Sequence, residues 1–190
     1  FNLEKTIMAI DKVISASITT DAVGPTQLNQ ASNYDFTGTV TGAGETNAPY
    51  FNATQNSSQS VADSTTTKIT YDVANINVGG GTYDTTNSRW TPGVAGRYFV
   101  SAWVFIKYAV STGQRIDMDI YKNGSSRVIG ARWRETGDLD GSNSAFVQGI
   151  VTLGTTDYIE AKMFQTSGAS RSMDNNPDFT YFEGFLIAGT

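Results

Sequence analysis

The chain has 190 residues, no cysteine, no histidine and a formal net charge of −5. The lack of cysteine excludes a disulfide framework, and the lack of both residue types excludes the usual zinc sites and Ser-His or Cys-His catalysis. The first 60 residues and the remainder are both net acidic, which makes nucleic acid and anionic membranes poor partners. No apolar run approaches the roughly 20 residues that a membrane-spanning helix needs, so we expect no membrane insertion.

Two parts of the chain differ in composition. Residues 1 to about 60 are polar and turn-rich and hold 5 of the 22 aromatic residues, so this part cannot bury enough apolar surface to fold alone. We expect an extended anchor or shaft over residues 1–48, with a frayed tail as the alternative, and one folded domain over residues 49–190. Because the sequence opens with Phe1, we also expect either preceding residues or a natural start at Met8.

Residues 49–190 predict an all-β domain. Apolar runs rich in β-branched and aromatic residues recur there roughly every 8 to 12 residues, without a long helical period. Turn residues separate these runs, for example at Pro92–Gly93 and Asn123–Gly124. The pattern favours a β-sandwich or jelly roll.

Two of the predicted strands, residues 97–108 and 181–188, are apolar on both faces. A small sandwich has one dry interior, so a strand with two dry faces implies a second buried surface, formed with other copies of the chain. The alternative is a sheet covered by the chain's own loops. Alternation does not tell which face meets the other copies, so the predicted interface takes residues from both: Tyr98, Phe99, Val100, Trp103, Phe105, Phe182, Phe185 and Ile187.

The order of motifs in residues 49–189 resembles the C1q domain, a relative of the tumour necrosis factor fold. The run TYDTTNSRWTPGVAGRYFV (residues 82–100) is similar to the family's Tyr-Asp pair, its aromatic-Thr-Pro strand end and its Gly-x-Tyr strand start. Ile120–Gly124 resembles the family's hairpin, and Phe182–Ile187 resembles its closing strand. The resemblance implies a ten-stranded jelly roll that assembles as a compact trimer.

A second resemblance concerns the segment before this domain. Residues 14–44, ISASITTDAVGPTQLNQASNYDFTGTVTGAG, resemble the Thr-, Ala- and Gly-rich segments of bacteriophage fibres and virion appendages. It implies that residues 1–48 contact other virion structural proteins and that the domain is displayed on the outside of the particle.

Three groups of polar residues are candidate sites. Asp117 and Asp119 share a strand face and could act as the carboxylate pair of a glycoside hydrolase, although a solvent-facing strand explains them more simply. Asp138, Asp140 and Asn143 offer oxygen ligands for Ca²⁺, and some C1q relatives hold calcium near the loop that corresponds to Asp140. Arg132 and Arg134 share a face, with Trp133 opposite and inward, and could meet an anionic surface glycan.

These observations favour a non-enzymatic, homotrimeric virion appendage, a phage fibre or capsid appendage, that attaches to a host surface glycan or protein through several weak sites. We expect no catalytic residues and no cofactor other than the possible Ca²⁺. The alternatives are a capsid decoration protein without a receptor role, a secreted extracellular C1q-like ligand or adhesin, and a glycan-degrading enzyme that uses Asp117 and Asp119.

Overall fold

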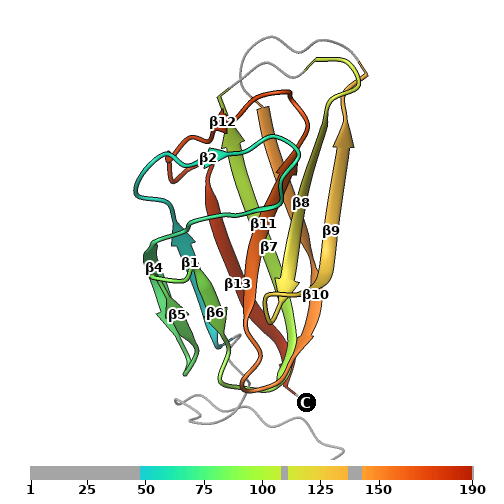
Figure 1. Cartoon of the computed structure of the whole chain (residues 1–190). Coiled ribbons are helices and arrows are strands. Elements are labelled where there is room, and N and C mark those ends of the chain that lie inside the picture. The colour runs from blue at the N-terminus through green and yellow to red at the C-terminus, as the bar shows by residue number, and fades with distance from the viewer. Residues whose placement is uncertain (1–47, 108–110, 137–142, 190) are drawn as a thin grey trace, which may run out of the picture. The chain divides into compact units, whose positions relative to one another are not determined.

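The computed structural model describes residues 48–107, 111–136 and 143–189, which belong to a compact unit that spans Glu45–Thr190. All regular secondary structure in these residues is β-strand, and ten strands of three or more residues form a two-layered sandwich (Figure 1). The all-β, ten-stranded prediction is therefore confirmed. Apart from Ala48, the predicted anchor segment lies outside the described residues. Among the residues that the structure describes, no helix is long and apolar enough to cross a bilayer.

One layer, here called the β7 sheet, has five antiparallel strands. In spatial order they are β10 (Asn143–Leu153), β7 (Gly96–Ile106), β13 (Tyr181–Gly189), β1 (Tyr50–Thr54) and β4 (Val73–Val78). Strand β7, between β10 and β13, follows the predicted alternation, because its even-numbered side chains from Tyr98 to Ile106 are buried between the sheets and Phe99, Trp103 and Phe105 lie on the opposite face. We call that opposite face the outer face of the β7 sheet.

The second layer, the β8 sheet, also has five main strands. In spatial order they are β5 (Thr82–Asp84), β6 (Arg89–Thr91), β11 (Ile159–Gln165), β8 (Arg115–Lys122) and β9 (Ser126–Arg134), and the two-residue strand β3 (Thr67–Lys68) also pairs with β11. A further pair of two-residue strands, β2 (Ser60–Val61) and β12 (Arg171–Ser172), lies at one end of the sandwich (Figure 1).

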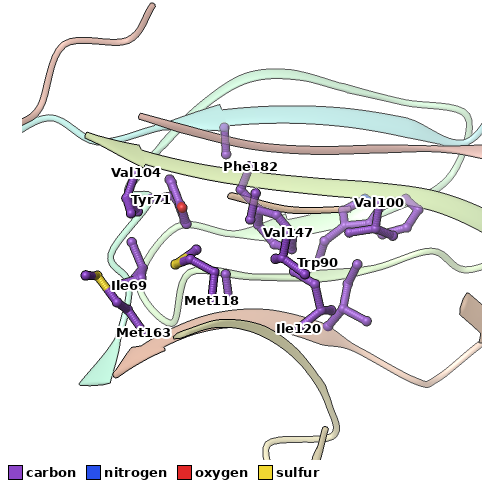
Figure 2. Close-up of a cluster of buried hydrophobic side chains, with 14 of the residues drawn as sticks. Ile69, Tyr71, Trp90, Val100, Val104, Met118, Ile120, Val147, Met163 and Phe182 are labelled. Carbon is purple, nitrogen blue, oxygen red and sulfur yellow. The ribbon is translucent and has the colours of Figure 1, made fainter. Parts of the chain in front are cut away.

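The core fills the space between the two sheets with aromatic and aliphatic side chains. Met118, Ile120 and Met163 of the β8 sheet and Val100 and Phe182 of the β7 sheet belong to one cluster of buried side chains (Figure 2). Towards β6, the ring of Trp90 stacks on Phe51 at 4.5 Å between centroids, and Phe51 packs edge-on against Phe182 at 4.8 Å. This aromatic cluster joins strands that are distant in sequence and anchors β1 to both layers.

The hairpin between β8 and β9 sets the position of the charged residues discussed below. Asn123 and Gly124 both have positive φ angles, of 53° and 75°, as the Asn-Gly turn requires. The Asn123 side chain donates to Asp157 Oδ1 at 2.8 Å, which fastens the turn to the loop before β11. The register that follows pairs Asp119 of β8 with Gly130 of β9.

Candidate functional site

An apolar row crosses the whole outer face of the β7 sheet. Its members are direct cross-strand neighbours, one from each strand: Ile150, Phe99, Phe185, Tyr50 and Val78. The rings of Phe99 and Phe185 lie 5.4 Å apart. Phe99 is partly buried, and the exposed fraction of the other four ranges from 38% at Phe185 to 64% at Ile150. Solvent-exposed apolar residues are normally scattered singly, so a continuous row of five is a candidate contact surface.

Two further rows continue this face. The next is mainly polar, with Gln148, Ser101, Glu183 and Asn52 as direct neighbours, and Asn52 Nδ2 donates to Glu183 Oε2 at 3.2 Å. The third is aromatic: Trp103 stacks on Phe146 at 4.4 Å and on Tyr181 at 6.0 Å. The outer face thus carries one apolar row on each side of a polar row. The apolar rows provide contact area, and the polar row can fix the register of a partner through hydrogen bonds.

The structure divides the eight predicted interface residues between the two faces of the β7 sheet. Phe99, Trp103, Phe105, Phe185 and Ile187 are partly or well exposed. Tyr98, Val100 and Phe182 are instead fully buried between the sheets of one chain, so we correct their assignment from interface to core. Contact of the remaining five with another copy stays a prediction.

Asp117, on the outer face of the β8 sheet, is not the solvated residue that the sequence predicts, because only 3% of it is exposed. Two guanidinium groups cover its carboxylate. Arg132 donates from Nε to Oδ1 at 3.0 Å and from Nη2 to Oδ2 at 3.1 Å, and Arg115 donates from Nε to Oδ1 at 2.9 Å and from Nη2 to Oδ2. Since both oxygens already accept two charged hydrogen bonds, Asp117 is poorly suited to act as a nucleophile or a proton donor.

Asp119 is equally buried but almost unpaired. It is 6% exposed, its nearest cation is Arg127 with Nη1 3.6 Å from Oδ1, and Oδ1 has no hydrogen-bond partner among the described residues. Oδ1 points towards Gly130, where a Cβ atom would lie only 2.6 Å away. The space left by Gly130 forms part of an open pocket of about 300 Å³, lined by Asp117, Asp119, Arg127, Gly130, Ala131 and Arg132.

The two aspartates should respond in opposite ways to replacement by asparagine. Burial favours a higher pKa for Asp117, but hydrogen bonds from Arg115 and Arg132 outweigh it and hold the pKa below its usual value. The resulting stabilisation of the fold is fully present at pH values above the pKa that Asp117 has in the unfolded chain. It is lost as the pH falls through the lower pKa that Asp117 has in the folded chain. Burial raises the pKa of Asp119, so its charge destabilises the fold at neutral pH and the cost disappears as the pH falls.

Asp117→Asn should therefore lower the free energy of unfolding at pH 7 by about 1–3 kcal/mol, a loss limited by the exposure of both arginines. Asp119→Asn should raise the free energy of unfolding by up to about 1 kcal/mol, and both differences should shrink near pH 3. Urea denaturation of the two variants at each pH measures these changes. A destabilising effect of Asp119→Asn at pH 7 would contradict this account of the carboxylate.

The structure separates the two arginines that the sequence predicts as a pair. Arg132 lines the pocket, whereas Arg134 lies beyond it and donates from Nη1 to the backbone oxygen of Gly113 at 3.2 Å. Sequence reasoning missed Arg127 and Gly130, which complete the pocket. A signal for them existed in the run from Arg127 to Arg134, which holds three arginines and one glycine, but its meaning depends on the register with β8.

The predicted calcium site falls largely outside the described residues. Asp138 and Asp140 belong to residues 137–142, and only Asn143, the first residue of β10, is placed. Within the described ranges, no group of three or more acidic side chains could hold a metal ion. Calcium binding by the Asp138–Asn143 loop therefore stays a prediction.

Comparisons with known proteins place this fold. No protein-family model and no curated protein matches the chain. Among solved structures, Eiger TNF from S. frugiperda matches with a TM-score of 0.53 at 14% identity, covering 74% of this chain and 93% of that one. Murine APRIL at pH 8.0 matches with 0.53 at 16%, covering 73% and 98%. The globular domain of zebrafish complement 1qA matches with 0.52 at 17%, covering 75% and 99%. The predicted C1q/TNF-like jelly roll is confirmed, and identities this low show the fold alone.

Proposed function

We propose that this chain is a non-enzymatic binding protein whose jelly-roll domain assembles as a homotrimer through the outer face of the β7 sheet. The observation that carries the proposal is the apolar row from Ile150 to Val78, which crosses all five strands. The aromatic row of Phe146, Trp103 and Tyr181 extends the same surface. Burying both rows against other copies removes apolar surface on either side of the polar row from water, which is the main driving force for association.

We further propose that the trimer is an external appendage of a virus particle, a phage fibre or capsid appendage that attaches to a host surface. The support is the resemblance of residues 14–44 to segments that precede trimeric heads in such appendages. In this arrangement residues 1–48 contact other virion proteins and the three domains point outward. Three weak sites held together gain avidity, so no single deep pocket is needed. A capsid decoration protein without a receptor role would use the same assembly.

A secreted ligand or adhesin is the second candidate, and the fold shared with the structural neighbours is equally compatible with it. The matching structures are a TNF, APRIL and a complement 1qA globular domain, all from animals. Such a protein would use the same trimeric domain outside a cell and would need no virion partner. The two candidates differ in where the chain is found.

Mass spectrometry of purified virus particles and of the particle-free medium distinguishes them. We expect mass spectrometry to find the chain in the particles. In a separate competition experiment, the purified protein should reduce adsorption of those particles to host cells. The Phe185→Asp protein at the same chain concentration should compete at least about 100-fold less well, because a monomer has no avidity. Finding the chain only in the particle-free medium would favour the secreted ligand and overturn the virion proposal.

A further inference from the structure

The pocket on the outer face of the β8 sheet contains a carboxylate oxygen without a partner. Asp119 is 6% exposed, and its Oδ1 lacks a hydrogen-bond partner among the residues the structure describes. Leaving a buried charged acceptor unsatisfied costs free energy that a ligand donor can offset. Lys162, the direct neighbour of Asp119 on β11, does not satisfy it, since Lys162 Nζ lies 3.1 Å from Glu160 Oε1 and donates to the Gly124 backbone oxygen at 2.7 Å.

Two guanidinium groups stand beside this acceptor. Arg127 Nη1 is 3.6 Å from Asp119 Oδ1, too far for a hydrogen bond, and the Arg127 side chain is 55% exposed. Arg132 is held in place because its Nε and Nη2 bind Asp117, and its side chain is also 55% exposed. The pocket therefore presents one buried acceptor next to donors that a ligand can approach from solvent.

Gly130 leaves the space beside the buried acceptor free of a side chain. A Cβ atom at this position would lie 2.6 Å from Asp119 Oδ1, so any other residue would push against the carboxylate. With glycine there, the open pocket measures about 300 Å³, at the lower end of the range for small-molecule sites.

The charges of the lining residues select the class of ligand. The lining carries two carboxylates, Asp117 and Asp119, and two guanidinium groups, Arg127 and Arg132, while Arg115 binds Asp117 from outside the lining. An anionic ligand would be repelled by Asp119, and a cationic ligand would be repelled by the arginines. A hydroxyl group is both a donor and an acceptor, so two adjacent hydroxyls can donate to a carboxylate and accept from a guanidinium without adding charge.

We propose that this pocket binds a vicinal diol of a neutral sugar, with Asp119 Oδ1 accepting a hydrogen bond from one hydroxyl and Arg127 donating to the next. This site names the class of ligand for the proposed function. The biological role of the site rests on that function, whereas sugar binding itself does not. The β7-sheet face proposed to meet other copies lies on the opposite side of the sandwich, so each subunit of the trimer would present one sugar site outward. Individually weak sites would then act together on a glycan-covered surface.

Saturation-transfer NMR on the full-length protein tests the site. The ligands are the methyl glycosides of mannose, galactose and glucose, with glucuronic acid and glucosamine as charged counterparts. We expect at least one neutral glycoside to bind and both charged sugars to bind more weakly. Gly130→Ala should reduce binding about tenfold or more by displacing the Asp119 carboxylate. Arg134→Ala, on the same strand but outside the pocket, should leave binding unchanged.

A second variant protects the test against misfolding. Arg127 has an exposed side chain, so Arg127→Ala should keep the melting temperature of the parent and still lose binding about tenfold. Tighter binding of glucuronic acid or glucosamine, no binding of any neutral glycoside, or full binding by both pocket variants would each overturn the sugar site. A trimer that binds no sugar would leave the proposed assembly intact, whereas a monomer that binds sugar would overturn the assembly alone.

Discussion

Replacing Phe185 with aspartate should convert the proposed trimer into a folded monomer. Phe185 lies in the middle of the apolar row, pairs directly with Phe99 and Tyr50, and is 38% exposed in the single chain. In the proposed trimer three carboxylates would be taken out of water within an apolar contact, at a cost of several kcal/mol each. The change does not touch the core, because Phe185 points away from the β8 sheet, so the monomer should keep its strand content.

Val128→Asp is the matched control for this prediction. Val128 lies on β9, in the other sheet, and has the same exposed fraction of 38%. It adds the same charge to the same kind of exposed apolar position, so it should leave the trimer intact. Multi-angle light scattering and circular dichroism on both variants give the mass and the strand content. A trimeric Phe185→Asp protein would exclude the apolar row as the contact surface.

Replacing Trp90 with alanine should remove a large part of the stability of the domain. Trp90 is fully buried, stacks on Phe51 at 4.5 Å and meets the ring of Tyr98 at 5.3 Å. Truncating a buried aromatic side chain of this size costs about 3–5 kcal/mol, against a total stability of about 5–15 kcal/mol for a typical domain. The loss should be that large because the rings of Phe51 and Tyr98, both from the opposite sheet, pack on Trp90 and cannot close the cavity.

The measurement is urea denaturation in the monomeric Phe185→Asp background, where the midpoint does not depend on protein concentration. Trp133→Ala is the control, because Trp133 is only partly buried at the margin of the core and should cost clearly less. An equal loss for the two tryptophans would mean that the aromatic cluster around Trp90 does not dominate the core.

The strand pattern predicted much of the fold but not the direction of its faces. Alternation in residues 97–108 correctly separates Tyr98 and Val100 from Phe99 and Trp103, and the Asn123–Gly124 turn lies where the sequence places it. Since both faces of β7 are apolar, only the pairing of the two sheets decides which face is the core. Tyr98, Val100 and Phe182 were therefore assigned to the interface although they pack within one chain.

The charged pocket was less predictable, because it depends on contacts between strands. Asp117 and Asp119 alternate with apolar residues, which normally indicates a solvated face. Their burial follows from the register of β8 with β9, which places Arg132 opposite Asp117 and Gly130 opposite Asp119. Nothing in the local sequence around Asp119 specifies that register. Only the pairing of the two strands gives Asp117 an arginine partner and leaves Asp119 Oδ1 without a hydrogen bond.

The mass of the unmodified 190-residue chain in solution tests the central claim most directly. We expect light scattering at micromolar concentration to give three chains of 20.4 kDa, about 61 kDa in total, with no dependence on dilution over the measured range. A mass of one chain under these conditions would contradict the trimer and, with it, binding through three linked sites.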